Sequence, residues 1–307
     1  MDRAASSRDG GEHAAKQVRR RRGRCPGART GLVAAALLGL AVTAQAACSR
    51  VIRVPVAPIG LSVVTSGGAV SGVYPDVLRR IETETGCRFE FSIVPRARLE
   101  AMFISGQADL LMPASRTPAR DARGQFVPLV KARPVLISLN SDRPAVANLQ
   151  ELLERRDLRV ALVRGFDYGE AYQQLIPRLK EQQRLVMEAD AGAVARAMER
   201  GLADVTLMVP AIFTGTLHQD NRTRALLDRL RYEPLSDLGW GESGIYLSPR
   251  LAPNDRELMA EALDKAVRSG LVWKAMQRHY PPGTYEEGMR ALVPAAALPA
   301  SATSATK

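Results

Sequence analysis

The chain alternates two kinds of apolar pattern between residues 51 and 281. Short runs of Val, Ile and Leu bounded by polar or turn residues are typical of buried strands, and apolar residues at helical spacing predict amphipathic helices. The predicted strands are 52–56, 88–94, 109–112, 158–163, 185–188, 204–208 and 244–248, and 126–139 is mostly extended. The predicted helices are 75–85, 98–105, 149–155, a segment from the turn 165–169 to about 180, 193–200, 210–217, 257–269 and 272–279. This alternation predicts parallel sheets covered by helices on both faces.

One local pattern occurs twice. A glycine ends a predicted helix, and an aspartate three residues later begins a buried strand, in Gly106–Asp109 and again in Gly201–Asp204. Glycine supplies the left-handed backbone of the helix end, and aspartate favours the tight turn before the strand. The repeat predicts two lobes of similar construction.

The first 46 residues have the pattern of an export signal. Basic residues from Arg19 to Arg29 precede the uncharged apolar run 31–42, which is shorter than the roughly 20 residues that a membrane-spanning helix needs. Ala44-Gln-Ala46 then provides a cleavage site of the small-x-small kind. Residues 1–46 are therefore predicted to be a signal peptide and the mature protein to be periplasmic. An uncleaved membrane anchor and a lipid anchor at Cys48 are the alternatives.

The charge distribution argues against a nucleic-acid partner. The net charge is +11, from 43 Lys and Arg against 32 Asp and Glu, but residues 1–46 hold nine of the basic and three of the acidic residues. The rest of the chain is mildly basic and evenly mixed, which is ordinary for a soluble protein. With 46% hydrophobic and 24% charged residues, the composition excludes a disordered chain.

Two cysteines follow the predicted signal peptide. Cys48 just precedes the first predicted strand, and Cys87 opens the second. Parallel neighbouring strands with aligned starts can bring two Cα atoms within about 7 Å, the limit for a disulfide. Exported proteins retain disulfides, so a Cys48–Cys87 bond is predicted. Two free buried thiols are the alternative.

Several short motifs occur in order over residues 51–281. They are Gly72-Val-Tyr-Pro-Asp76, Gly106-Gln-Ala-Asp109, Ser115-Arg-Thr-Pro-Ala-Arg120 followed by Phe126, the strand and turn 160–169, Gly201-Leu-Ala-Asp204, and Ser269-Gly270 with Trp273. In this order and spacing they resemble the family 3 extracellular solute-binding proteins, the polar-amino-acid-binding group of ATP-driven importers.

The resemblance implies an α/β, two-lobed periplasmic-binding-protein fold of type II, with two doubly wound sheets joined by two crossover strands near 136–140 and 241–247. In this class ligands bind at the carboxyl ends of strands, here between the lobes. It also implies a monomer that serves an ABC permease of the inner membrane and needs no cofactor. The expected parts are 50–138 plus 245–288 for lobe 1, 139–244 for lobe 2, and 289–307 for a disordered tail.

The resemblance also places candidate ligand contacts in the first lobe. Thr117-Pro-Ala-Arg120 matches the place where the family's arginine clamps a ligand carboxylate, and Ser115 matches a position that contacts the same ligand. The planar guanidinium group suits this role, because it makes two parallel charge-assisted bonds to a carboxylate. The alternative is that Arg120 is one more surface arginine.

On the opposing lobe, Gly165, Phe166 and Asp167 lie between a predicted strand and a predicted helix. Backbone N–H groups at a helix start form an anion site without needing particular side chains. A helix cap by the Asp167 side chain is the alternative, and the two roles are compatible.

Two positions depart from the amino-acid-binding pattern. Val209 stands where such family members have a carboxylate for the ligand ammonium, and Ala57-Pro58 stands where many relatives have another acid. A buried ammonium without an anion is costly. A carboxylate-bearing ligand without an amine is therefore predicted to bind better than a standard α-amino acid, and a different binding site altogether is the alternative. Glu242 could substitute for the missing acid, although a solvated charge is the favoured interpretation.

Three classes of function compete. A solute-binding protein for an ABC importer leads, and an exported dehydratase-like enzyme or a sensing module for a membrane receptor on the same fold are the alternatives. Of the three histidines, His13 lies in the predicted signal, and His218 and His279 lie outside the matching segments. The sequence also lacks a His/Cys metal spacing, a Gly-x-Ser-x-Gly turn and a phosphate-binding loop, so an enzyme is disfavoured.

Overall fold

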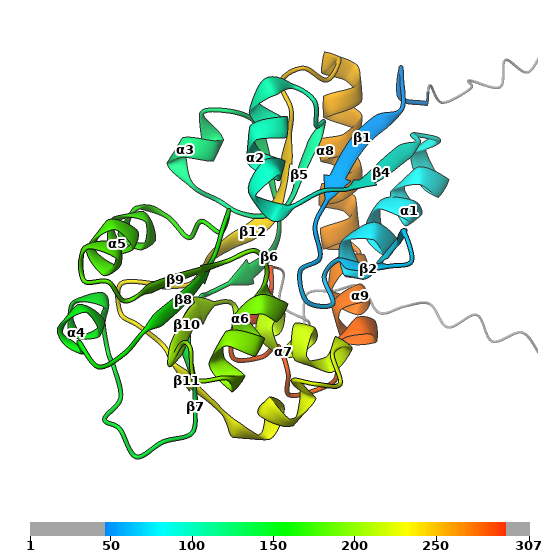
Figure 1. Ribbon diagram of the computed structural model, residues 1–307. Coiled ribbons are helices and arrows are strands. Elements are labelled where there is room, and N and C mark those ends of the chain that lie inside the picture. The colour runs from blue at the N-terminus through cyan, green and yellow to red at the C-terminus, as the bar shows by residue number, and fades with distance from the viewer. Residues whose placement is uncertain (1–46, 293–307) are drawn as a thin grey trace, which may run out of the picture. The chain divides into compact units, whose positions relative to one another are not determined.

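The computed structural model describes residues 47–292, which form two lobes, each built on its own sheet (Figure 1). The predicted signal peptide, residues 1–46, and residues 293–307 lie outside the described residues. We call the part built on strands β5, β6, β12 and β13 lobe 1, and the part built on strands β7 to β11 lobe 2.

Lobe 1 is assembled from two separate stretches of the chain. Its first stretch contains β1 (Ile52–Val56), β2 (Val64–Ser66), β3 (Ala69–Ser71), α1 (Val73–Thr85), β4 (Phe89–Ile93), α2 (Arg96–Ser105), β5 (Leu110–Ser115), α3 (Pro118–Asp121) and β6 (Gln125–Ala132). The second contains β12 (Gly241–Leu247), α8 (Pro253–Arg268), α9 (Leu271–His279) and β13 (Met289–Ala291). Its strands are ordered β13-β6-β12-β5, and β1 pairs with β4.

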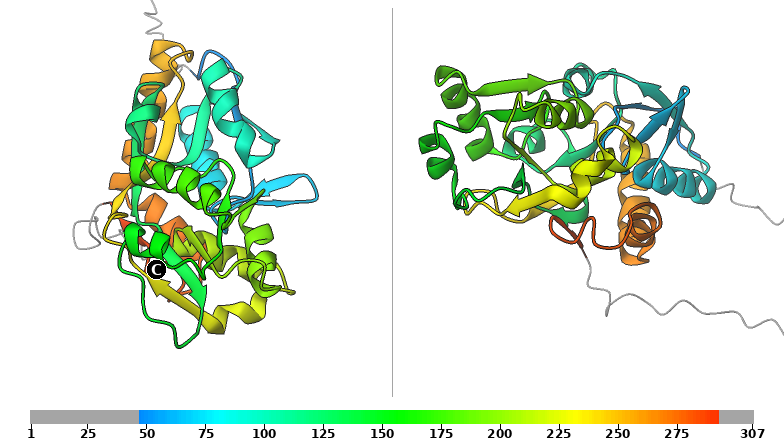
Figure 2. Two further views of the ribbon diagram at one scale, coloured as in Figure 1. Left: turned by 60° about the vertical axis from the view of Figure 1, so that its left-hand side comes forward. Right: turned by 60° about the horizontal axis from the view of Figure 1, so that its bottom comes forward.

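Lobe 2 is one continuous stretch between the two parts of lobe 1. It contains β7 (Val135–Leu139), α4 (Leu149–Glu154), β8 (Val160–Val163), α5 (Glu170–Glu181), β9 (Leu185–Glu188), α6 (Ala191–Glu199), β10 (Val205–Met208), α7 (Pro210–Gln219), η1 (Arg224–Arg229) and β11 (Leu230–Glu233). The strand order is β11-β7-β10-β8-β9. Helices α4 and α5 lie on one side of this sheet, and α6 and α7 lie on the other (Figures 1 and 2).

The sheet of lobe 2 is mixed, and the four-stranded sheet of lobe 1 is antiparallel, which corrects the expectation of parallel sheets. β8 runs parallel to β9 and β10, and β1 runs parallel to β4, as the βα alternation predicts. β7, β6, β12 and β13 all pair antiparallel with their neighbours. Parallel neighbours need a crossover connection, whereas the chain enters β7 and β12 directly from the other lobe.

The two connections between the lobes do not lie in the segments predicted for them, 136–140 and 241–247. It leaves β6 and enters β7 through Arg133 and Pro134, and it returns from β11 to β12 through residues 234–240. The segments 136–140 and 241–247 instead contain paired strands, β7 and β12. Pro134 has no N–H to continue a strand ladder, so the first sheet ends just before it.

The prediction that a disordered tail begins at residue 289 is wrong for the first three of its residues. Residues Met289–Ala291 form β13, which pairs antiparallel with Lys131 and its neighbours on β6. Met289 is 6% exposed and packs into the core, so this short strand is held by burial as well as by its ladder.

The two Gly-x-x-Asp repeats have the same structural role in the two lobes. The Asp109 carboxylate accepts the backbone N–H of Arg53 at 2.8 Å, and the Asp204 carboxylate accepts that of Arg159 at 2.8 Å. In each pair the aspartate N–H also donates to the arginine carbonyl, at 2.9 Å. Each aspartate therefore joins the strand that it begins to the neighbouring strand.

The two aspartates differ in burial. Asp109 is fully buried and also accepts from the guanidinium groups of Arg50 and Arg53, whereas the Asp204 side chain is 32% exposed. Burial alone would raise the pKa of Asp109. The hydrogen bonds from the two arginines outweigh burial and hold the pKa of this carboxyl well below its usual range.

A disulfide joins Cys48 to Cys87, with their Cα atoms 4.7 Å apart. It is the pair that the sequence predicts, because β1 and β4 are parallel neighbours whose starts are aligned from Ile52 and Phe89. Among the described residues, no helix is long and apolar enough to cross a membrane.

Replacing Asp109 with Asn should destabilise the protein more than replacing Asp204 with Asn. The first variant loses the anion shared by two arginines, so the free energy of unfolding should fall by about 2–3 kcal/mol. The second loses an exposed pair, which contributes about 1 kcal/mol or less. Urea unfolding of the two variants, with the disulfide intact, measures the difference. Equal losses would show that burial of Asp109 adds nothing.

Candidate functional site

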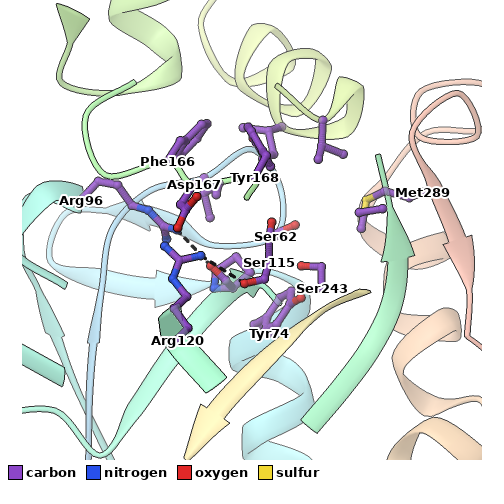
Figure 3. A pocket seen from close by; sticks show the side chains of 15 residues that line it. Ser62, Tyr74, Arg96, Ser115, Arg120, Phe166, Asp167, Tyr168, Ser243 and Met289 are labelled. Carbon is purple, nitrogen blue, oxygen red and sulfur yellow. Dashed lines mark hydrogen bonds between the residues drawn. The ribbon is translucent and has the colours of Figure 1, made fainter. Parts of the chain in front are cut away.

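A pocket lies between the two lobes, at the ends of strands from both (Figure 3). On the lobe 1 side it is lined by Ser115 at the end of β5 and by Arg96, which follows β4. On the lobe 2 side it is lined by residues that follow β8 and β10, Phe166 and Val209 among them. Strand ends are where ligands bind in doubly wound folds, because the backbone there is free to present different side chains.

Arg120 lines the pocket and is 3% exposed, so it is not a surface arginine. Its Nε and Nη2 donate to the two carboxylate oxygens of Glu100, at 3.3 and 2.9 Å, and its Nη1 donates to the Ser115 carbonyl at 3.2 Å. Three of the five N–H groups of the guanidinium are therefore used, and two remain. Ser115 lines the pocket as well and helps to hold Arg120 there.

Thr117 does not line the pocket but sets the position of Arg120. It is the N-cap of α3, where its hydroxyl accepts the Arg120 N–H at 3.3 Å and Pro118 follows as the first helical residue. Its own N–H donates to the Tyr246 hydroxyl at 3.1 Å. The Thr-Pro pair therefore starts a single helical turn that fixes the backbone of Arg120.

Arg96, which the sequence reasoning missed, is the second guanidinium group of the pocket. It is 8% exposed, and its Nη2 donates to the Pro113 carbonyl at 3.1 Å. Its Nε and Nη1 are buried without a hydrogen-bond partner, and its guanidinium lies 5.5 Å from the centre of the Phe166 ring. Burial, and after it the charge of Arg120, lowers the pKa of Arg96 to about 10. Its position directly after a predicted strand was the signal that could have identified it.

The Phe166–Asp167 segment lines the pocket, but not as the start of a helix. α5 begins at Glu170 with Gly169 as its N-cap, so the expected anion site of helix N–H groups at 166–168 is displaced. The Phe166 N–H donates instead to the Val163 carbonyl at 3.2 Å. Asp167 accepts the Gly169 N–H at 2.9 Å, which holds the turn that precedes the helix.

Asp167 supplies the kind of acidic group that Val209 does not. Val209 is buried and lines the pocket with its apolar side chain, as the sequence suggests. Among the described lining residues, however, Asp167 contributes one carboxylate from the same lobe. The valine therefore does not leave the pocket without an acid. Glu242 is outside the lining and pairs with Arg116 at 3.0 Å near the surface.

Two tyrosines complete the polar lining, one from each lobe. Tyr74 on α1 and Tyr168 before α5 both line the pocket, and the Tyr168 hydroxyl is buried without a hydrogen-bond partner. Burial raises the pKa of both hydroxyls well above the usual range of tyrosine. Both therefore stay neutral and can donate a hydrogen bond to an anionic ligand.

Gly165 does not line the pocket, but it is where the lobe 2 backbone meets the start of α2. Its φ is +84°, and a Cβ atom there would lie 3.1 Å from the Cα of Ala97 and 3.2 Å from the carbonyl oxygen of Arg96. Any other residue would push against the backbone of the opposite lobe. The glycine therefore permits the close approach that encloses Arg96.

The sequence over residues 52–282 matches the model of the bacterial extracellular solute-binding proteins, family 3, and the chain belongs to this family. No curated protein sequence is recognisably similar to it. The chain shares its fold, the two-lobed type II periplasmic-binding-protein fold, with many solved structures.

Three of these structures show the range of proteins with this fold. An ancestral arginine-binding protein bound to arginine is 15% identical, with a TM-score of 0.61 over 75% of this chain and 98% of that one. The substrate-binding protein AbpA of an amino acid ABC transporter, from Streptococcus pneumoniae with bound L-arginine, is 19% identical, with a TM-score of 0.58 over 74% and 94%. A histidine kinase sensor domain is 19% identical, with a TM-score of 0.60 over 75% and 96%. The family and these structures are binding proteins, and at these identities the likeness shows the fold.

Replacing Gly165 with Ala should weaken the close contact between the lobes. Gly169, with a φ of +98° and no atom within 4 Å of its Cβ direction, is the matched control. Both alanines strain a left-handed backbone by about 1–2 kcal/mol, but only the first meets the other lobe. Urea unfolding should therefore show a larger loss of stability for Gly165→Ala than for Gly169→Ala. Equal losses would mean that the contact between the lobes is not tight at Gly165.

Proposed function

We propose that this chain is a periplasmic solute-binding protein that captures a small carboxylate-bearing solute between its lobes and delivers it to an ABC importer. The observation that carries the proposal is the buried Arg120 guanidinium, with two N–H groups still available, in a pocket whose walls come from both lobes. Membership of an extracellular solute-binding family and the signal-peptide pattern of residues 1–46 support export.

Capture follows from the division of contacts between the lobes. A carboxylate at Arg120 and Ser115 touches lobe 1, while the rest of the solute meets Phe166 and Tyr168 of lobe 2. Only the closed arrangement makes both sets of contacts, so the ligand stabilises that arrangement. Hinged closure of this kind gives a permease a surface that differs between the loaded and the empty protein.

Asp167 is the residue through which an amine would be recognised. Its carboxylate lines the pocket, and one of its oxygens accepts the Gly169 N–H. The other oxygen can accept from a ligand ammonium. We therefore include both amino acids and their deaminated analogues in the ligand class. Asp167→Asn should weaken binding of the amine-bearing members only.

A ligand-sensing module for a membrane receptor is the second candidate, favoured by the shared fold of the histidine kinase sensor domain. The binding step is the same in both functions. Uptake of the identified solute separates them, because a strain without an importer's binding protein loses uptake, whereas a strain without a sensor keeps the transport step itself.

Replacing Arg120 with Ala should weaken capture strongly. A thermal-shift screen of the protein, purified from cells that express the full chain, against matched pairs of amino acids and deaminated analogues identifies a ligand. At 100 times its dissociation constant a ligand stabilises the protein by roughly 2.7 kcal/mol. Calorimetric titration of that ligand should then show Arg120→Ala binding at least about 30-fold more weakly, since losing a buried charge-assisted pair costs about 2–5 kcal/mol.

Arg116→Ala is the matched control for this test. Arg116 is 52% exposed, pairs with Asp121 and Glu242, and does not line the pocket, so its loss should leave the affinity unchanged. An Arg120→Ala variant that binds as well as Arg116→Ala would contradict the proposed role of Arg120.

A further inference from the structure

We propose that Arg96 is a second anion-binding group of the pocket and that the captured solute is a small dicarboxylate, with one carboxylate at Arg120 and the other at Arg96. This inference rests on the proposed function and narrows its ligand class. The Arg96 side chain is buried, and two of its three guanidinium nitrogens have no hydrogen-bond partner.

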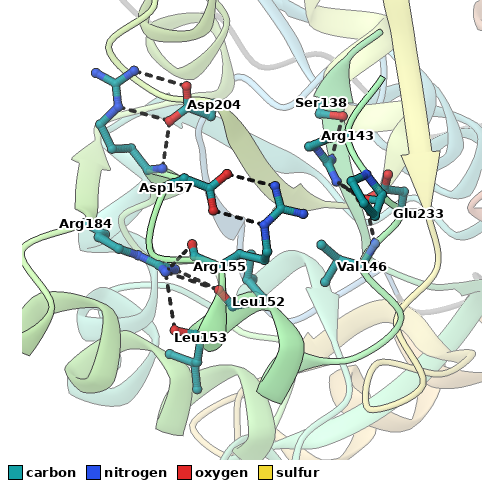
Figure 4. Close-up of polar contacts among 12 residues, drawn as sticks. Ser138, Arg143, Val146, Leu152, Leu153, Arg155, Asp157, Arg184, Asp204 and Glu233 are labelled. Carbon is teal, nitrogen blue, oxygen red and sulfur yellow. Dashed lines mark hydrogen bonds and ion pairs between the residues drawn. The ribbon is translucent and has the colours of Figure 1, made fainter. Parts of the chain in front are cut away.

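Arg96 is distinct among the three buried arginines in the described part of the chain. Arg120 has the Glu100 carboxylate at 2.9 Å. Arg184 makes four hydrogen bonds to three carbonyl groups at the C-terminal end of α4, two of them on Leu152 and Leu153 (Figure 4). Arg96 has one hydrogen bond, to the Pro113 carbonyl, and Nε and Nη1 have none.

No anion is bonded directly to the Arg96 guanidinium, although the Glu100 carboxylate bound to Arg120 acts on it at longer range. No acidic side chain in residues 47–292, Asp167 included, forms an ion pair with it. A guanidinium group buried away from water is costly unless an anion or several acceptors surround it. Nε and Nη1 carry three of its five N–H groups, so most of its hydrogen-bond donors have no acceptor.

The Arg96 side chain is buried and is also one of the residues that line the pocket. Figure 3 shows the Arg96 side chain entering the pocket beside Phe166, with its guanidinium next to that of Arg120. The two arginines come from different helices, Arg96 from the start of α2 and Arg120 from α3. Arg120 is paired with Glu100, yet its charge still lowers the pKa of Arg96, so an anionic ligand group beside Arg96 would be favourable.

Two carboxylates satisfy this arrangement better than one. The two N–H groups that remain on Arg120 match the two oxygens of one carboxylate. A second carboxylate is then needed for the donors of Arg96, and the neutral Tyr168 hydroxyl lies buried in the same pocket as a further donor. Arg120 already has the Glu100 carboxylate, but a monocarboxylate bound to either arginine would still leave the remaining N–H groups of the other without an acceptor.

The test compares isosteric ligands that differ only in the second charge. The pairs are succinate and succinamate, L-aspartate and L-asparagine, and L-glutamate and L-glutamine. Calorimetric titration of the wild-type protein should show the dicarboxylate binding at least about 10-fold more tightly than its amide in the pair that fits the pocket. In Arg96→Gln this ratio should fall to about one, and Arg96→Lys, which keeps the charge, should retain part of it.

Two further variants control the result. Arg98→Gln, an exposed arginine on the same helix, should leave the ratio unchanged. The thermal midpoint of the ligand-free protein should rise in Arg96→Gln, because a buried charge with no anion bonded to it is removed, and fall in Arg120→Gln, because a paired charge is lost. A structural role for Arg96 would instead lower the midpoint in both.

The failures of the two proposals are distinguishable. If an amide binds as tightly as its dicarboxylate and Arg96→Gln leaves the ratio unchanged, the inference is wrong while carboxylate capture at Arg120 stands. If no carboxylate in the panel binds the wild-type protein, the proposed function itself is wrong.

Discussion

The burial of the Arg96 guanidinium group where the two lobes meet, with two of its nitrogen atoms unpaired, is the constraint on which the binding site depends. Arg96 has lost the water that would solvate its charge, and no acid of the described chain replaces it. If a ligand supplies the anion, as we propose, then the ligand stabilises the arrangement in which the lobes enclose Arg96. The rest of the fold positions this side chain where two lobes meet.

Lobe 1 holds Arg96 rigidly at both ends of α2. At the C-terminal end Gly106 closes the helix, and Asp109 follows three residues later and is bound by Arg50 and Arg53. At the N-terminal end the Pro113 carbonyl fixes one guanidinium nitrogen, and Gly165 of lobe 2 lies against the backbone. Asp109 and the disulfide stabilise lobe 1, whereas the buried charge of Arg96 destabilises it. Binding sites commonly contain residues that lower stability in this way.

The sequence predicts most of the framework because the framework depends on local patterns. Every predicted strand and helix is present, since the buried runs and the helix-ending glycines act over a few residues. The hairpin of β2 and β3, the strand β11 and the single turn α3 escape prediction, because each is short and is fixed by tertiary contacts.

The site is less predictable than the framework. The family motif indicates Arg120 and Ser115, which do line the pocket, but it also suggests Thr117, which caps a helix instead. The position of Arg96 after a predicted strand suggests a site residue, but nothing in the sequence indicates that its charge is buried, because charged residues are usually solvated. Only the closure of lobe 2 over it, through Phe166, shows that it is buried and unpaired.

A crystal structure of the protein with its tightest-binding ligand tests the central claim most directly. The account predicts a ligand carboxylate within hydrogen-bond distance of Nε or Nη1 of Arg96 and a second carboxylate at Arg120, with both lobes in contact with the ligand. A bound ligand that leaves Arg96 paired with Asp167, or turned out of the pocket into solvent, would contradict it.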